Sequence, residues 1–130
     1  MNEWGKSGTG PGEFIVAHSI SVSPQGNVYV ADRENGRLQW FDRHGLFLGQ
    51  RRYGGQLFSV AFSPGGDLYI GVKPRGVPFD QEFNVVKIDP ATGEMLGRIE
   101  VGAHELAFSP DGTLWPASRN SELLLFRPRN

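Results

Sequence analysis

The stretch SVSPQGNVYVA, residues 21–31, decides the fold of this chain, because its pattern occurs three times. A Ser-Pro-x-Gly turn separates two short, alternating apolar runs, and such turns stand at 23–26, 63–66 and 109–112, spaced 40 and 46 residues apart. Proline presets φ at the second turn position, and glycine at the fourth lets the chain enter the next strand. Repeats of about 40 residues that contain only strands are typical of β-propeller blades with four strands each.

The strands expected around these turns follow one order in every copy. First strands are predicted at 19–22, 59–62 and 105–108, second strands at 28–31, 68–72 and 114–118, third strands at 37–42, 84–89 and 122–126, and fourth strands at 46–49 and 95–98. In the first copy, Asn35-Gly36 is the turn into the third strand, which Arg37 begins. No window of eleven residues keeps a helical apolar period, so we expect essentially no helix.

The three copies predict an all-β β-propeller chain of three four-stranded blades, at about residues 15–53, 54–101 and 102–130 of a single domain, 1–130. The third copy stops before its fourth strand, whereas residues 2–5 precede the first copy. We therefore expect a strand at 2–5 to complete a last blade. Three blades are half of a six-bladed ring.

Three blades alone would leave two sheet faces in water. A four-stranded face is roughly 19 Å by 17 Å, so two faces project on the order of 600 Å², the upper range for the largest apolar patch of a soluble monomer. A homodimer that closes a six-bladed ring, with residues 2–5 of each chain completing the last blade of its partner, would cover both faces and the free edge. The alternative is that the sequence is a fragment of a longer six-bladed chain.

Composition sets further limits. The 130 residues carry 13 Lys and Arg against 14 Asp and Glu, a net charge of -1, so we expect neither nucleic acid nor an anionic membrane surface as a partner. Cysteine is absent, which excludes disulfides and thiolate metal sites. No apolar run approaches the ~20 residues that span a bilayer, and residues 1–5 lack the basic start and apolar stretch of a signal peptide. As written the chain is expected to be cytoplasmic, although a removed leader would not be seen.

A histidine register suggests a metal site. Five residues before each turn serine stand His18, Phe58 and His104, which open the blade strands that line the central channel. Neutral imidazole is a common zinc ligand, so His18 and His104 are candidate ligands; the alternative is that each only hydrogen-bonds at the end of its strand. Glu105 could serve calcium, a hard cation. His44 lies in a turn outside this register, and we expect it to be solvated.

A second register is basic. Seven residues after each turn glycine stand Arg33, Lys73 and Arg119, at the ends of the second strands. Such cations at one mouth of the channel would bind a small anionic ligand, with Arg binding bidentately and Lys as a point charge. The alternative is a set of exposed strand ends in salt bridges with neighbours such as Asp32 and Glu34.

These motifs together resemble a known family. The residues that carry the resemblance are Trp4-Gly5, Pro11-Gly12-Glu13-Phe14, Ala17-His18-Ser19-Ile20, the run VADRENGR at 30–37, Val72-Lys73-Pro74 and Ala103-His104-Glu105. The chain resembles the NHL-repeat propellers and, more closely, the C-terminal half of the peptidyl-α-hydroxyglycine α-amidating lyases. The resemblance implies a six-bladed propeller with a catalytic zinc on three channel histidines and a structural calcium. Such lyases cleave an N-hydroxyalkylglycine end to a peptide amide and glyoxylate.

The resemblance also assigns residues. It implies that His18 and His104 match two of the three zinc ligands and that Arg33 matches a catalytic arginine near the substrate carboxylate. The third histidine and the tyrosine proposed as base belong to the half that this sequence does not contain. Glu105 stands where the family has aspartate, Ala17 and Ala103 replace prolines, and Gly102 replaces a methionine.

Three hypotheses about function follow. The first is a half-propeller that dimerises, whose His, Arg and Lys positions bind a metal ion or a small anion, with lyase activity lost. The second is an active zinc-dependent carbon-nitrogen lyase that releases glyoxylate, as a dimer or as part of a longer chain. The third is an NHL scaffold that binds a peptide or a protein.

Overall fold

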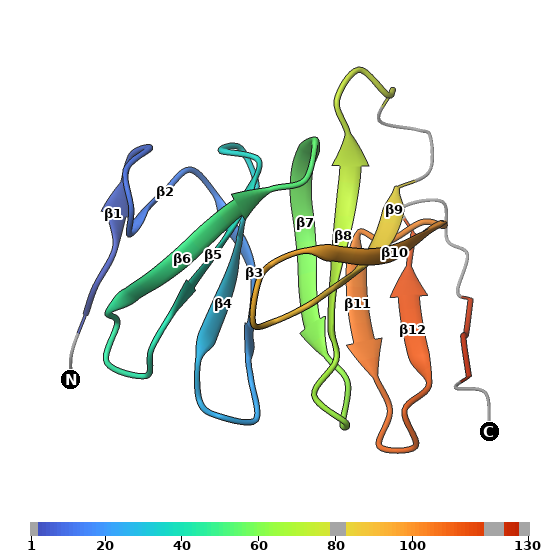
Figure 1. Ribbon diagram of the computed structural model, residues 1–130. Helices are drawn as coiled ribbons and strands as arrows, with labels where there is room; N and C mark the ends of the chain where they lie inside the picture. The colour runs from blue at the N-terminus through green and yellow to red at the C-terminus, as the bar shows by residue number, and fades with distance from the viewer. Residues whose placement is uncertain (1–2, 79–82, 119–123, 128–130) are drawn as a thin grey trace.

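The computed structural model describes residues 3–78, 83–118 and 124–127, and these residues form strands and turns without a helix (Figure 1). Two four-stranded antiparallel sheets each follow the chain order. The first consists of β3 (Ala17–Val22), β4 (Val28–Asp32), β5 (Arg37–Phe41) and β6 (Phe47–Arg52). The second consists of β7 (Gly55–Phe62), β8 (Leu68–Pro74), β9 (Asn84–Ile88) and β10 (Met95–Glu100). We call these sheets blade 1 and blade 2.

A third sheet begins the same pattern. It contains β11 (Glu105–Phe108) and β12 (Leu114–Ala117), and an antiparallel bridge joins Leu114 to Phe126 at the place of the expected third strand. We call this sheet blade 3. The prediction of all-β, propeller-type blades is confirmed, and the strands of blades 1 and 2 lie within a few residues of the predicted ranges. Of the third strand predicted for blade 3 at 122–126, residues 122–123 lie outside the described residues.

The repeated turns fold as their sequence requires. Gly26, Gly66 and Gly112 have φ angles of 89°, 90° and 85°, a region that residues with a Cβ rarely adopt. In each turn the glycine N–H donates to the carbonyl of the turn serine, at 2.9, 3.0 and 2.9 Å. The serine, proline and glycine spacing therefore fixes each connection between first and second strands.

The blades stack side by side through their apolar faces (Figure 1). One buried cluster lies between blades 1 and 2 and includes Leu38, Leu57 and Ile70. A second lies between blades 2 and 3 and includes Phe58, Phe83 and Leu106. The first strands β3, β7 and β11 are neighbours, as expected for the strands nearest a propeller axis.

The N-terminal segment differs from the expected strand at 2–5. Residues 3–5 form no strand, and β1 (Lys6–Ser7) instead pairs in parallel with β2 (Glu13–Phe14). The Trp4 ring lies 4.6 Å from the Phe41 ring on the face of blade 1 away from blade 2. Residues 1–2 lie outside the described residues, so the structure leaves their pairing with a partner untested.

Within the described residues the structure contains no helix long and apolar enough to traverse a lipid bilayer.

Candidate functional site

The channel register folds into a bulge in two blades. The pairing of β3 with β4 shifts between Ala17 and Ser19, and that of β7 with β8 shifts between Leu57 and Ser59. The skipped residues are His18 and Phe58, which occupy equivalent positions of the repeat. A bulge leaves its extra residue out of the ladder and re-aims its side chain. The local backbone therefore directs both rings out of the regular sheet face.

The three register residues converge on one point. The His18 and His104 ring centroids are 5.1 Å apart, and the Phe58 ring lies 5.2 Å from His18 and 5.1 Å from His104. Both imidazoles are partly buried. The structure thus brings together the two predicted metal ligands, although they are 86 residues apart in the sequence.

Glu105 completes a cluster of three groups that could hold a metal ion. Its carboxylate and the imidazole nitrogens of His18 and His104 offer ligand atoms within 4.8 Å of one another. The Nδ1 atom of His18 lies 4.0 Å from Oε1 of Glu105. Two imidazoles and one carboxylate are a donor set that zinc accepts.

Hydrogen bonding sets the orientation of one imidazole. His18 Nδ1 lies 2.6 Å from the carbonyl oxygen of Phe58, and a carbonyl can only accept. Nδ1 therefore carries the proton, which leaves the lone pair of Nε2 available to a metal.

The spacing of the cluster can be tested against zinc. Bond lengths of 2.0–2.2 Å to nitrogen and oxygen place the ligand atoms of a tetrahedral site about 3.3–3.5 Å apart. Separations of up to 4.8 Å exceed this by little more than 1 Å. Because the Glu105 side chain is 57% exposed, it is free to rotate toward the imidazoles. The three residues fit a metal ion of this kind once the Glu105 carboxylate and the Nε2 edge of His18 turn toward a common point.

Arg33 lies beside this cluster. Its guanidinium carbon is 5.4 Å from the centroid of the Phe58 ring, and its Nε donates to Glu34 at 2.7 Å. Among the described residues no acceptor takes the two terminal nitrogens of Arg33. The guanidinium, 27% exposed, therefore keeps the paired donors that bind a carboxylate bidentately.

Backbone strain accompanies Arg33. Val16 has a φ of 61°, which is unusual for a β-branched residue. The N–H groups of Arg33 and Glu34 donate to the carbonyls of Val16 and Ile15, at 3.0 and 3.1 Å. These bonds hold the strained residue two positions before His18 and tie the entry of β3 to the end of β4.

The other two predicted cations are placed differently. Lys73 is only 9% exposed, and its Nζ donates to the carbonyl of Val77 in its own loop. Arg119 lies outside the described residues. The predicted ring of three cations at the channel mouth stays a prediction. His44 is exposed, as expected for a solvated turn residue.

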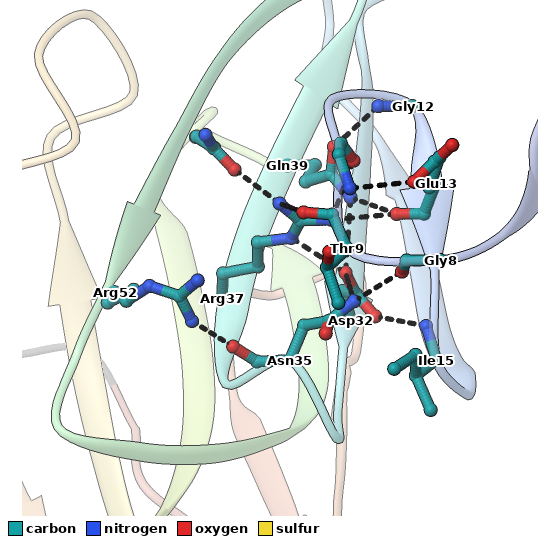
Figure 2. Close-up of polar contacts among 12 residues, drawn as sticks. Gly8, Thr9, Gly12, Glu13, Ile15, Asp32, Asn35, Arg37, Gln39 and Arg52 are labelled. Carbon is teal, nitrogen blue, oxygen red and sulfur yellow. Dashed lines mark hydrogen bonds and ion pairs between the residues drawn. The ribbon is translucent and has the colours of Figure 1, made fainter.

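Sequence reasoning missed a buried polar cluster around Arg37 (Figure 2). Arg37 is 1% exposed and forms a 2.8 Å ion pair with Asp32, which is fully buried. Its remaining four N–H groups donate to the carbonyls of Thr9, Gly10 and Glu13 and to Oε1 of Gln50. All five guanidinium donors therefore have acceptors.

Neighbouring side chains complete this cluster. Asp32 accepts hydrogen bonds from the Asn35 side chain and from the backbone N–H of Ile15, each at 2.9 Å. Gln39 donates to the Glu13 carbonyl and accepts from the Gly12 N–H. The cluster fastens the segment 8–15, which leads to the channel strand β3, against blade 1. The signal in the sequence is the density of polar residues in the 31–37 stretch.

Comparison with known proteins agrees with the blade pattern. Residues 14–41 match the family model of the NHL repeat. Peptidyl-glycine alpha-amidating monooxygenase A of Xenopus laevis is 41% identical over 129 residues, covering 87% of this chain and 14% of that protein. The B form of the same species is 31% identical over 131 residues, covering 87% and 15%. The chain thus spans about one seventh of the length of these relatives. NHL repeat-containing protein 3 of Mus musculus is 50% identical over 46 residues, 35% of this chain and 13% of that protein.

Solved structures resemble the chain in fold alone. The WD40 β-propeller domain of Doa1 has a TM-score of 0.65 at 16% identity, over 85% of this chain and 36% of that chain. The luciferin-regenerating enzyme has a TM-score of 0.61 at 18% identity, over 86% and 40%.

Proposed function

Because this chain has an NHL β-propeller fold and is homologous to the peptidyl-glycine alpha-amidating monooxygenases, we propose that it pairs with a second copy to close a six-bladed ring. In this ring, His18, His104 and Glu105 bind a divalent metal ion, and Arg33 binds a small anionic ligand beside it. The convergence of the two histidines is the observation that carries the metal site.

Ring closure is supported by a contact that repeats between blades. Tyr29 of blade 1 packs edge-on against Phe62 of blade 2, with ring centroids 5.0 Å apart. Tyr69 of blade 2 packs against Phe108 of blade 3 at 5.2 Å. The next members of this series are Trp115 on blade 3 and Val22 on blade 1. A second copy would supply each of them with its partner.

The outer face of blade 1 has the character of an interblade surface. Ile20 and Val22 on β3 are 64% and 57% exposed. The equivalent serines of blades 1 and 2 each bond to the following blade. Ser19 Oγ accepts a hydrogen bond from the Val60 N–H, and Ser59 Oγ donates one to the Ala103 carbonyl. Apolar side chains and strand edges of this kind are normally covered in a propeller.

The N-terminal segment lies where the preceding blade would end. A Cβ on Gly45 of blade 1 would lie 2.7 Å from Trp4, just as one on Gly93 of blade 2 would contact Tyr53 at 3.4 Å. Trp4-Gly5 and Tyr53-Gly54 both combine an aromatic residue with a glycine of positive φ, 97° and 80°. Trp4 therefore takes toward blade 1 the place that Tyr53 takes toward blade 2.

Sedimentation equilibrium tests the dimer. The wild-type chain is expected at twice its 14.3 kDa mass, and Val22→Asp is expected to shift it to the monomer. Leu96→Asp is the matched control, because Leu96 is 59% exposed on the outer strand β10 and faces no expected partner. A wild-type chain that stays monomeric at micromolar concentration contradicts ring closure.

The metal site has its own test. Titration of the metal-free protein with Zn²⁺ should give saturable binding, and His18→Ala and His104→Ala should each weaken it by more than about tenfold. His44→Ala, at an exposed turn, should leave binding unchanged. Equal affinities in all four proteins would exclude the site and favour the NHL scaffold that binds a peptide or protein.

Two-fold symmetry bears on the chemistry of the site. A dimer would place four histidines around one channel, two from each chain, rather than the three that the lyase resemblance implies. A zinc ion bound there would supply a Lewis acid. The chain's own contribution is the bidentate donor pair of Arg33, which suits a carboxylate. We propose that anion binding is retained and that lyase activity is lost.

The active lyase remains the second candidate, favoured by the 41% identity to the Xenopus laevis relative. Release of glyoxylate from a peptide that ends in α-hydroxyglycine, measured with zinc-loaded protein, separates the two. Turnover that disappears in Arg33→Gln would establish the enzyme, and binding without turnover would establish the first proposal.

A further inference from the structure

The interface between blades 1 and 2 is sealed by four aromatic side chains. These are Tyr29, Trp40, Tyr53 and Phe62. The Trp40 indole stacks on the Tyr29 ring, with centroids 5.8 Å apart and an interplanar angle of 17°. It covers Gly49 of β6 so closely that a Cβ there would lie 2.5 Å from the indole.

The next interface lacks two of these four aromatic rings. Strand pairing places Tyr29 opposite Trp40 and Trp40 opposite Gly49 in blade 1, and it places Tyr69 opposite Lys87 and Lys87 opposite Gly97 in blade 2. Lys87 therefore stands at the position of Trp40. By the same register, Val101 stands at the position of Tyr53, whereas Tyr69 and Phe108 keep the other two rings.

The missing rings leave a cavity of about 670 Å³ between blades 2 and 3. Among the described residues, no atom lies within 4 Å of a Cβ built on Gly97, in contrast to the covered Gly49. Tyr69, Val85, Ile99, Phe108, Leu114 and Phe126 provide its apolar walls. Its volume falls within the ~300–1,000 Å³ of small-molecule sites.

The charges on the cavity lining favour an anion. The lining contains three cations, Lys87, Arg98 and Arg127, and two acids, Asp67 and Asp111. Lys87 pairs with Asp67 at 3.3 Å, but both groups are well exposed, at 38% and 54%, so water weakens their attraction. An anionic group of a ligand that displaced this water would form a better shielded ion pair with the Lys87 ammonium.

We propose that this cavity binds a small planar aromatic molecule that carries a carboxylate. Its ring lies over Gly97 and against Tyr69, in the place that the Trp40 indole takes at the preceding interface. Its carboxylate pairs with the Lys87 ammonium or the Arg98 guanidinium at the rim. The site is separate from the His18 and His104 cluster and needs no metal.

Indole-3-acetate is the probe that tests this site, since it carries the same indole ring as Trp40. We expect saturable binding to metal-free wild-type protein by isothermal titration. Tryptamine, with the same ring and a positive charge, should bind at least about tenfold more weakly, a difference of about 1.4 kcal/mol. Lys87→Met keeps the cavity and removes the charge, so it should reduce the preference for the anion.

The decisive variant is Lys87→Trp, which rebuilds the Trp40–Gly49 pair on Gly97. It should abolish binding of indole-3-acetate and raise the melting temperature, because the indole fills the cavity itself. Lys6→Trp, on the exposed strand β1, is the control for added tryptophan and should bind as wild type. No binding by wild type, or undiminished binding by a folded Lys87→Trp protein, overturns the proposal, and neither result bears on zinc binding or ring closure.

Discussion

At the scale of single residues, Arg37 is a buried side chain whose five guanidinium donors all have acceptors. Its guanidinium satisfies one buried carboxylate and three backbone carbonyls of the segment 8–15. A planar group with five fixed donors can do this, whereas the ammonium of lysine has three donors at one point. Arg37 therefore fastens this segment as well as neutralising Asp32.

Replacing Arg37 should be costly. Arg37→Ala leaves the Asp32 carboxylate buried without its counter-ion, which typically costs about 3–5 kcal/mol. Arg37→Lys keeps the charge and should lose less. Urea denaturation provides the measurement, with Arg52→Ala as control, since Arg52 is an exposed arginine whose side chain donates to the Asn35 carbonyl.

If Arg37→Ala proves too unstable to purify, the free energy of unfolding can be measured on the double variant Asp32→Asn/Arg37→Ala instead. Removing the carboxylate should recover part of the lost stability, because the pair is coupled. Equal stabilities of Arg37→Ala, Arg37→Lys and wild type would refute the role given to this residue.

Tyr53 offers a prediction about pH. Burial raises the pKa of its phenol from 10.0 to about 12, and its hydroxyl donates to the Gly93 carbonyl at 2.6 Å. A raised pKa means that the neutral phenol stabilises the fold below about pH 10, and that this contribution is lost as the pH rises from 10 to 12.

Ultraviolet titration of tyrosinate should therefore show a step near pH 12 that is absent from Tyr53→Phe. The same variant should lose about 1 kcal/mol of stability at neutral pH with its hydrogen bond. Below pH 10 the difference in stability between the two proteins should stay constant, and it should narrow above that pH. A phenol that titrates near pH 10 would contradict the packing of Tyr53 between the blades.

At the scale of elements, the Ser-Pro-x-Gly turn is the unit that sets each hairpin. The turn makes the same backbone bond in all three blades, so the two strands that it joins begin in the same register. Val22, Phe62 and Phe108 each directly precede the turn serine, so this register gives them equivalent positions in the three blades. The consequence is that a local turn decides which side chains meet between blades.

Two adjacent glycines in the blade 2 turn, Gly65 and Gly66, show whether a glycine is needed there for its positive φ or only for its small size. Gly66→Ala places a Cβ at a φ of 90° and should cost at least about 1–2 kcal/mol. Gly65→Ala should be nearly neutral, because among the described residues a Cβ there would contact Ser63 Oγ alone, at 3.9 Å. Thermal unfolding of both variants checks the contrast, and equal effects would argue against the positive φ as the cause.

At the scale of the whole molecule, the proposed ring links stability to concentration. Partner binding stabilises only the folded state, so the melting temperature of the wild type should rise over about a hundredfold increase in protein concentration. Val22→Asp should melt at a temperature independent of concentration. A wild-type melting temperature that stays constant would speak against assembly.

The strands and the convergence of His18 with His104 could be predicted from sequence, because both follow from a repeated turn and a constant offset from it. The position of Arg37 could not, because its acceptors are carbonyls 24 to 28 residues away whose directions depend on the folded segment. The burial of Lys73 could not be predicted from the basic register either. A shared repeat position does not determine whether a neighbouring loop covers the side chain, as the loop with the Val77 carbonyl does here. Two residues in equal register can therefore have unequal surroundings.

The order of strands within the blades has a kinetic consequence. The two four-stranded sheets pair antiparallel strands that follow one another along the chain, so their hairpins close locally, whereas β1 and β2 pair in parallel. Pairing within a hairpin closes a shorter loop than pairing between blades, and shorter loops cost less entropy to close. We expect the hairpins of each blade to form before the blades pack together, since contacts between blades join residues far apart in the sequence. Blade 2 packs against both neighbours, so it is the natural template on which blades 1 and 3 are ordered.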